Sequence, residues 1–152
     1  MDFEGHTIDT LNFITASGHP SQCCSPDGKY WAVPVGATQK FIYNLETENL
    51  NIINHNNAGN GFMSFSPDGT KLIWTYEGSI YITDLNSAQT YLVIQGCESK
   101  TYSYASISGD GQKIIALRTD VIDLTSNKLY IEANIIIMNI DGSNEQIITL
   151  PQ

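Results

Sequence analysis

Histidine is the side chain best suited to hold a metal ion or to move a proton near neutral pH, and the sequence has three of them. His6, His19 and His55 would form a metal site only if the fold brought them together. His19 stands six residues before the serine of one Ser-Pro-Asp-Gly motif, whereas His55 stands eleven residues before the next. Because these offsets differ, the histidines do not occupy equivalent positions, and we predict no metal site and no cofactor.

Motifs of the common hydrolases and nucleotide-binding enzymes are absent from the sequence. There is no Gly-x-Ser-x-Gly, no His-Glu-x-x-His and no Walker-type loop. Residues 59–61, Gly-Asn-Gly, are predicted to form a turn because no helical pattern follows them. Residues 141–144, Asp-Gly-Ser-Asn, lack the later ligands of a calcium loop, so a hairpin turn is the better interpretation. We therefore predict no catalytic residue and a protein that is not an enzyme.

The net charge excludes one class of partner. Seven Lys and Arg stand against sixteen Asp and Glu, which gives −9 at pH 7. Such a field repels phosphate backbones and anionic lipid surfaces, so we expect neither nucleic-acid nor membrane binding. The first six residues have neither the basic region nor the apolar segment of a signal peptide. We expect a cytoplasmic protein if Met1 is native, with a periplasmic or secreted location as the alternative if a leader was removed.

The three cysteines give no disulfide framework. Cys23 and Cys24 are adjacent, and neighbours on a strand point to opposite faces, which disfavours a bridge between them. Cys97 lies far away in the sequence. We predict that all three are small buried apolar residues.

The elements that would position any site come from a threefold repeat. Ser25-Pro26-Asp27-Gly28, Ser66-Pro67-Asp68-Gly69 and Ser108-Gly109-Asp110-Gly111 are 41 and 42 residues apart. In such a turn Pro presets the first corner, Asp bonds neighbouring backbone, and Gly accepts a positive φ. The third copy has Gly109 in place of Pro, so we expect a looser turn there. A period near 40 with one hairpin turn per unit is typical of β-propeller blades.

Each unit aligns as four strands with period-2 apolar patterning. Trp31 and Trp74 fall inside these strands, so we expect them to pack between blades, although the aromatic residues could instead form a sugar-binding surface. Residues 11–14 resemble residues 50–53 and predict an additional leading strand. The predicted strands are residues 21–24, 30–33, 41–45 and 50–53, then 62–65, 71–74, 81–85 and 92–94, then 104–107, 113–116, 136–140 and 147–150.

These repeats resemble those of TolB-type and tricorn-type propellers, a WD40-like (PD40) repeat group. Two passages carry the resemblance: Ser66 to Trp74 followed by Ser79 to Leu85, and Ile136 to Asn144. The likeness spans roughly residues 8 to 150, and the Gly-His and Trp-Asp signatures of true WD repeats are missing. The resemblance implies a ring of six or more blades and no single activity, since such propellers serve as binding platforms, peptidase gates and enzyme scaffolds.

We therefore predict an all-β protein: a β-propeller segment of three four-stranded blades plus a leading outer strand, half of a six-bladed ring. Residues 1–152 form one repeat domain. Within it we assign residues 1–17 to the leading strand, 18–57 to blade 1, 58–98 to blade 2, and 99–152 to blade 3.

An insertion at residues 118–133 departs from the repeat. The link between second and third strands is short in the first two units, but here it is long and apolar. We expect it either to pack on a neighbouring subunit, to form a small hairpin about Ser126–Asn127, or to fold onto its own blade. Insertions in repeat arrays gather on one face, often the binding face. The candidate binding residues, at the channel mouth and in the links, are His19, Gln39, Lys40, His55, Tyr76, Glu77, Arg118, Asp120 and Tyr130.

The function predicted from the sequence is a protein-interaction and self-assembly module that completes a ring by homodimerisation, because three blades cannot close one. One alternative is a fragment of a larger propeller chain that gates or scaffolds a hydrolase or peptidase. The other is a propeller that binds a sugar or another small ligand.

Overall fold

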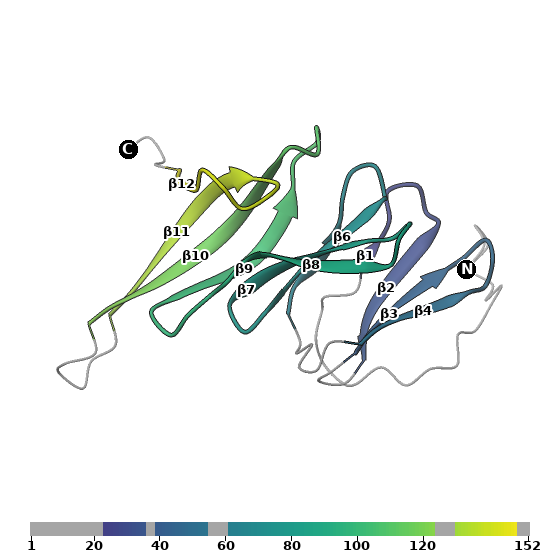
Figure 1. Cartoon of the computed structure of the whole chain (residues 1–152), viewed down its shortest axis with the longest axis horizontal. Coiled ribbons are helices and arrows are strands. Elements are labelled where there is room, and N and C mark those ends of the chain that lie inside the picture. Colours follow the sequence, from purple (N-terminus) through teal and green to yellow (C-terminus); the bar gives the residue numbers. More distant parts are fainter. Residues whose placement is uncertain (1–22, 36–38, 55–60, 124–129, 149–152) are drawn as a thin grey trace, which may run out of the picture.

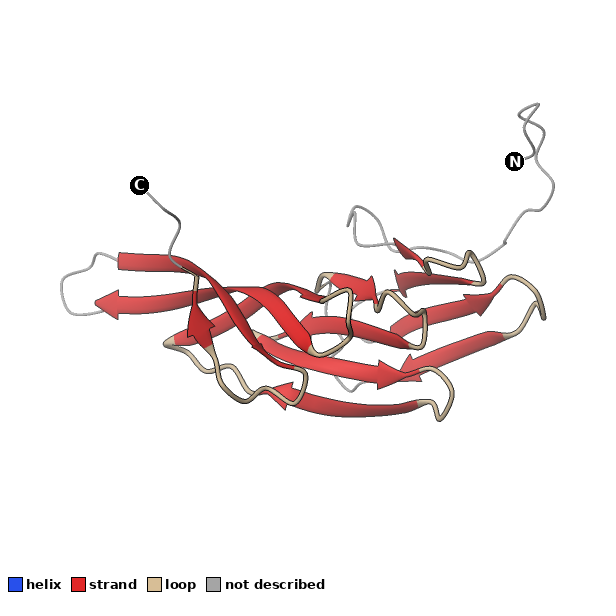
Figure 2. Cartoon of the chain, turned by 90° about the horizontal axis from the view of Figure 1, so that it is seen from above, coloured by secondary structure: helices blue, strands red, loops and turns tan. Residues whose placement is uncertain are grey.

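The computed structural model describes residues 23–35, 39–54, 61–123 and 130–148, and every regular element in these ranges is a β-strand (Figure 2). None of these residues belongs to a helix that could span a membrane. The twelve strands are β1 Cys23–Cys24, β2 Tyr30–Val35, β3 Gln39–Asn44, β4 Leu50–Asn54, β5 Met63–Phe65, β6 Lys71–Tyr76, β7 Ser79–Asp84, β8 Gln89–Ile94, β9 Lys100–Ile107, β10 Lys113–Asp123, β11 Tyr130–Asn139 and β12 Gln146–Ile147.

The strands form three four-stranded antiparallel sheets that lie side by side (Figure 1). The spatial order follows the chain in each: β1-β2-β3-β4 in blade 1, β5-β6-β7-β8 in blade 2 and β9-β10-β11-β12 in blade 3. Neighbouring blades contact each other through β1 and β5 on one side of blade 2, and through β9 with β5, β6 and β7 on the other. This confirms the predicted all-β fold of three four-stranded units. The predicted leading strand lies outside the described residues.

The turn between first and second strands has the same geometry in all three blades. In blade 2 the Ser66 hydroxyl donates to the Asp68 carboxylate at 2.5 Å, and the same oxygen of Asp68 accepts the Thr70 backbone N–H at 3.0 Å. These hydrogen bonds, that of Ser66 first, lower the pKa of Asp68 to about 2. Gly69 has φ +69°, a conformation that glycine adopts without strain.

The third of these turns is not looser, contrary to the prediction. Ser108 donates to Asp110 at 2.6 Å, and the Gly111 N–H donates to the Ser108 carbonyl at 2.9 Å, the distance found in the other two turns. The serine, aspartate and glycine make the hydrogen bonds of the turn. Proline only restricts the free chain, so Gly109 takes its place without changing the geometry.

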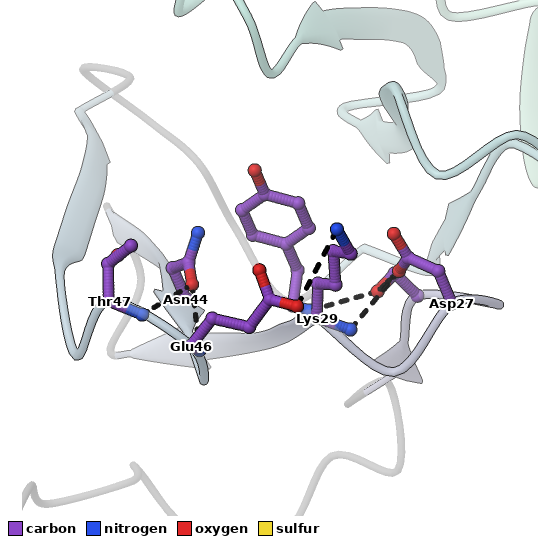
Figure 3. A network of polar contacts seen from close by, with 7 residues as sticks. Asp27, Lys29, Asn44, Glu46 and Thr47 are labelled. Atoms are coloured by element: carbon purple, nitrogen blue, oxygen red, sulfur yellow. Dashed lines mark hydrogen bonds and ion pairs between the residues drawn. The ribbon is translucent and has the colours of Figure 1, made fainter.

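A second turn follows the third strand of each blade, and in blades 1 and 2 a short polar side chain at the end of that strand holds it. In blade 1 the Asn44 Oδ1 atom accepts the backbone N–H groups of Glu46 and Thr47, both at 2.9 Å (Figure 3). Asp84 does the same in blade 2. Both kinds of turn lie at one end of each blade, which we call the turn rim. The opposite end, where second strands turn into third strands, we call the hairpin rim.

Two apolar clusters fill the spaces between blades. One contains Met63, Phe65, Leu72 and Trp74 of blade 2 with Ala32 and Ile42 of blade 1. The other contains Ile73, Ile80 and Ile82 of blade 2 with seven residues of blade 3. Successive side chains of β6 and β7 point to opposite faces of blade 2, and those on both faces are buried. Trp74 is fully buried, as predicted, and stacks on Tyr81 with ring centroids 4.6 Å apart.

The cysteines correct the sequence-based prediction. Cys23 is half-buried beside the first cluster, and burial raises the pKa of its thiol to about 12. Cys24 and Cys97 are exposed. Cys24 occupies the position of Phe65 and Ile107 in the repeat, but blade 1 has no described blade before it to cover that face.

The insertion in blade 3 is a hairpin extension. β10 and β11 run on together well past the turn of blade 2, pairing from Lys113↔Asn139 to Asp123↔Tyr130 with a register shift between Val121 and Asp123 (Figure 1). This agrees with the hairpin among the predicted alternatives. Its predicted turn at Ser126–Asn127 lies outside the described residues.

Candidate binding site on the hairpin rim

A hollow of about 400 Å³ lies on the hairpin rim between blades 2 and 3. It is formed by the β6–β7 hairpin, the start of β9 and Gly61, which precedes β5. We call it the rim hollow. Its lining residues are Gly61, Thr75, Tyr76, Glu77, Gly78, Thr101, Tyr102 and Ser103.

The β6–β7 turn places two of the predicted site residues here. Glu77 and Gly78 both have positive φ, +43° and +71°, the pattern of a two-residue hairpin loop whose twist matches its strands. The Tyr76 hydroxyl donates to the Glu77 carboxylate. A Cβ on Gly78 would lie 2.7 Å from the Thr101 side chain, so only glycine lets the turn sit against blade 3.

Two exposed aromatic residues follow residues of the rim hollow in the sequence, Phe62 after Gly61 and Tyr104 after Ser103. Phe62 and Tyr104 have ring centroids 5.5 Å apart at an interplanar angle of 51°. Tyr104 belongs to a bulge in β9, where Tyr104 and Ala105 together oppose the one residue Ala116 of β10. Sequence reasoning missed this pair because it placed Tyr104 in a regular strand. No local pattern distinguishes a strand with this bulge from one without it.

An ionic network stands behind the rim hollow and unites two other predicted residues. Arg118 pairs with Asp120 at 2.7 Å and with the Glu145 carboxylate, and all three side chains are mostly buried. The Tyr102 hydroxyl donates to the other Glu145 oxygen at 2.7 Å. Tyr102 therefore links the hollow to the network. Glu145 and Tyr102 were missed because 43 residues separate them in the sequence.

Hydrogen bonding sets the ionisation of this network. Burial alone would raise the pKa of Glu145, but hydrogen bonds from Tyr102 and Arg118 outweigh burial and lower it. Burial, reinforced by the bond to Glu145, raises the pKa of Tyr102. The network at neutral pH is thus a carboxylate held between a neutral phenol and a guanidinium, an arrangement that holds β10 and the turn before β12 together.

The other predicted residues lie elsewhere. Gln39 begins β3, where it pairs with Val35 and Asn54. Lys40 is fully buried between blades 1 and 2, in the interior rather than at a rim. His19 and His55 fall outside the described residues. Tyr130 opens β11 next to the undescribed end of the hairpin, so its backbone is far along the extension from the rim hollow.

A second hollow, also of about 400 Å³, separates the outer strands of blades 1 and 2. Aliphatic side chains and threonines dominate it, and its lining residues include no charged group. Such a lining offers burial but few directional contacts. The rim hollow, with a carboxylate, hydroxyl groups and adjoining aromatic rings, is the better candidate for specific binding.

Among the described residues no group of three or more His, Cys, Asp or Glu side chains is placed to hold a metal ion. The rim hollow instead combines hydrogen-bonding groups with aromatic faces. That combination suits recognition of a ligand by contact.

Solved structures of β-propeller proteins share this fold. A protein described as TolB from Agrobacterium tumefaciens matches with a TM-score of 0.59 and 15% identity, over 86% of this chain and 50% of that one. Oligogalacturonate lyase from Vibrio parahaemolyticus matches with a TM-score of 0.60 and 17% identity, over 84% and 38% of the two chains. Tricorn protease matches with a TM-score of 0.58 and 16% identity, over 80% and 12%.

These matches confirm the propeller fold and the resemblance to TolB-type and tricorn-type repeats. The chain spans half or less of the length of each of these proteins. They include enzymes as well as a TolB, so the fold is compatible with more than one kind of activity. No family model and no curated protein matches the sequence.

Proposed function

We propose that this three-blade propeller segment is a non-enzymatic module that binds proteins and completes its ring by pairing with a second copy of itself. The observation that carries the proposal is the exposure of one isoleucine. Ile115 in blade 3 is 43% exposed, whereas Ile73, at the same position in blade 2, is fully buried.

The two isoleucines have equivalent surroundings within their own blades. Ile73 pairs with Ser64 and Ile82, and Ile115 pairs with Ser106 and Ile137. Blade 3 covers Ile73, as its place in the cluster between blades 2 and 3 indicates. No described blade follows blade 3, so the same apolar surface is left open there. Exposed sheet faces of this kind mark interaction sites.

The hairpin extension continues that apolar surface. Leu117 pairs with Ile135 and Val121 with Ile131, and by strand alternation both pairs lie on the face of Ile115. Ile131 is 55% exposed and Ile135 39%. The charged residues Arg118, Asp120 and Glu132 alternate onto the opposite face, toward blade 2. An extension that is apolar on one face favours burial of that face against a further blade.

Blade 1 of a second copy is the occupant that the repeat favours. Its Cys24–Trp31 pair corresponds to Phe65–Leu72 in blade 2 and to Ile107–Ile114 in blade 3. Those two pairs are the ones that face the preceding blade inside the chain. A two-fold axis that brought blade 1 of each copy against blade 3 of the other would close a ring of six blades.

Sedimentation equilibrium tests the pairing. We expect the wild-type chain to behave as a dimer of about 34 kDa, twice the 16.8 kDa of one chain. Ile115→Lys should dissociate it because the substitution places a charge in the apolar interface. Leu92→Lys is the matched control, since Leu92 is 46% exposed on the outer strand of blade 2. A dimer that Ile115→Lys leaves intact would contradict the proposal.

A second candidate function is that the segment belongs to a longer propeller that gates or scaffolds a hydrolase or peptidase. This chain matches only 12% of the length of tricorn protease, so a segment of this size can be part of a much longer protein. In that case further blades of the same protein would cover Ile115. The isolated chain would then aggregate through this face rather than form a discrete dimer.

A further inference from the structure

The aromatic pair beside the rim hollow has no part in ring pairing. Phe62 directly precedes β5 of blade 2 and Tyr104 lies in β9 of blade 3, so the two rings meet between these blades of one chain. The face of blade 3 that would pair with a second copy carries Ile115 instead. Phe62 is 36% exposed and Tyr104 65%. The two rings therefore form one exposed pair within a single chain.

The backbone forces Tyr104 outward. Its φ is +52°, in the left-handed region that bulky residues rarely adopt. The bulge keeps its neighbour Ala105 fully buried while the tyrosine ring points to solvent. Strained residues and bulges of this kind concentrate where a side chain must be aimed for function. The exposure of Tyr104 is thus imposed by the fold and is not the fraying of a loose strand.

Phe62 is held as firmly as Tyr104. The Thr75 N–H donates to the Phe62 carbonyl at 3.0 Å. A Cβ on the preceding Gly61 would lie 1.6 Å from the Thr75 carbonyl oxygen, so only glycine permits this approach. The first strand of blade 2 therefore enters at a fixed position, which places the Phe62 ring beside Tyr104.

The hollow beside the pair carries one carboxylate, and the cation behind it, Arg118, is already paired with Asp120 and Glu145. Gly61 and Ser103, the chain neighbours of the two rings, line the rim hollow together with Glu77. The Glu77 side chain is exposed, and its carboxylate accepts the Tyr76 hydroxyl. The lining includes no lysine or arginine, and the chain as a whole carries −9. Aromatic faces beside a carboxylate attract a cation through the ring quadrupole and through its charge.

We infer that Phe62, Tyr104 and Glu77 bind an arginine side chain of a basic peptide segment. The flat guanidinium can stack on an aromatic face while it donates to a carboxylate, which a lysine ammonium does less well. Its methylene stem would pack on the second ring. This inference names the chemistry of a partner for the proposed protein-binding role, and it does not depend on closure of the ring.

The direct test is a titration of the wild-type chain at low ionic strength with two blocked tripeptides, one with arginine between two glycines and one with citrulline, its neutral isostere. We expect the arginine peptide to bind about 3 to 30 times more tightly, with the advantage falling as salt is added. Equal binding of both peptides would overturn the inference. Preferential binding of a neutral oligosaccharide such as maltohexaose would overturn it too, and would indicate a sugar site.

Two variants and two matched controls locate the site. Tyr104→Asn removes the ring but suits a positive φ, so its melting temperature should not fall while the arginine preference is lost. Glu77→Gln should lower the affinity for the arginine peptide at least about threefold. The controls are Tyr91→Asn, a tyrosine 42% exposed on β8, and Glu48→Gln, an exposed glutamate that also has positive φ, +57°, but lies on the turn rim. An arginine preference that survives both Tyr104→Asn and Glu77→Gln contradicts the inference.

Sedimentation of the same samples separates this inference from ring pairing. A dimer with no preference for the arginine peptide overturns the peptide site alone. A monomer that prefers the arginine peptide overturns the pairing alone.

Discussion

The ammonium nitrogen of Lys40 lies 4.7 Å from the centroid of the Trp74 ring, across the boundary between blades 1 and 2. Both side chains are fully buried. The ring face offers the cation partial compensation for lost hydration. Burial nevertheless lowers the pKa of Lys40 to about 8. A lysine that sequence reasoning assigned to ligand binding is thus part of the packing between two blades.

Lys40 predicts a specific dependence of stability on pH. Its pKa is lower in the folded state than in the unfolded chain, so the unfolded chain binds more protons between about pH 8 and 10.5. The burial penalty is complete below pH 8 and is relieved as the pH rises through this window. Lys40→Met removes the penalty, so its stability advantage over the wild type should shrink by up to about 1.4 kcal/mol per pH unit there.

The measurement is urea denaturation of both proteins at several pH values from 7 to 10.5, read as the difference between them. The difference is needed because the raised pKa of Cys23 makes both proteins less stable as the pH rises through part of the same range. A difference that does not vary with pH would show that Lys40 keeps an ordinary pKa in the fold.

Trp74 is expected to be the costliest single truncation in the boundary between blades 1 and 2. Trp74→Ala should lower the free energy of unfolding by about 3–5 kcal/mol. Trp74→Phe keeps an aromatic ring against Tyr81 but loses the 3.1 Å indole N–H bond to Thr83, so it should cost about 1–2 kcal/mol. Urea denaturation measures both. A loss below 1 kcal/mol for the alanine variant would mean that blades 1 and 2 are not packed through this ring.

The equivalent turns of blades 2 and 3 should respond in opposite directions to substitution. Gly69→Val places a β-branched residue at φ +69° and should destabilise by at least about 1–2 kcal/mol. Gly109→Pro restores the residue found in the other two copies and should stabilise by about 0.4–1 kcal/mol by restricting the unfolded chain. Thermal melts compare the two. A lower melting temperature for Gly109→Pro would show that the third turn differs from the turns of blades 1 and 2.

The network of Arg118 and Glu145 should be energetically coupled, because both side chains are only 17% exposed. A double-mutant cycle with Arg118→Met and Glu145→Gln should give a coupling free energy of about 1–3 kcal/mol. Lys29 and Glu46 on the turn rim are the matched control, 3.5 Å apart with side chains 46% and 60% exposed (Figure 3). Their coupling should stay below about 0.5 kcal/mol. Equal coupling in the two pairs would contradict the structural role assigned to the network.

Local chemistry made most of the fold predictable. The serine, aspartate and glycine of each hairpin turn form their hydrogen bonds within six residues, so the turns, and with them the strand order, follow from the sequence. The position of Trp74 inside the predicted strand 71–74 likewise identified it as a residue that packs between blades. The prediction of a looser third turn was wrong because it assumed that proline holds the turn, whereas Asp110 holds the same geometry without it.

Features that depend on how blades meet were not predictable in this way. The bulge at Tyr104 depends on how β9 pairs with β10, and the bond of Tyr102 to Glu145 joins segments far apart in the chain. Cys24 stands at an apolar repeat position, but it is exposed because its blade is the first of the described array. Lysine is usually exposed, and no sequence pattern indicated that Lys40 would be buried. Its burial depends on the Trp74 ring of the next blade.

A disulfide trap tests the central claim of ring pairing most directly. Within the chain, Ile73 of blade 2 and Ile107 of blade 3 belong to one buried cluster. In the proposed ring the corresponding pair between two copies would be Ile115 and the exposed Cys24. Ile115→Cys in a Cys97→Ser background, oxidised at micromolar concentration, should run as a covalent dimer of about 34 kDa, twice the mass of one chain. Leu92→Cys in the same background should remain at 16.8 kDa. A monomeric Ile115→Cys protein, or a ladder of higher oligomers instead of a closed dimer, would contradict the pairing of two half-rings.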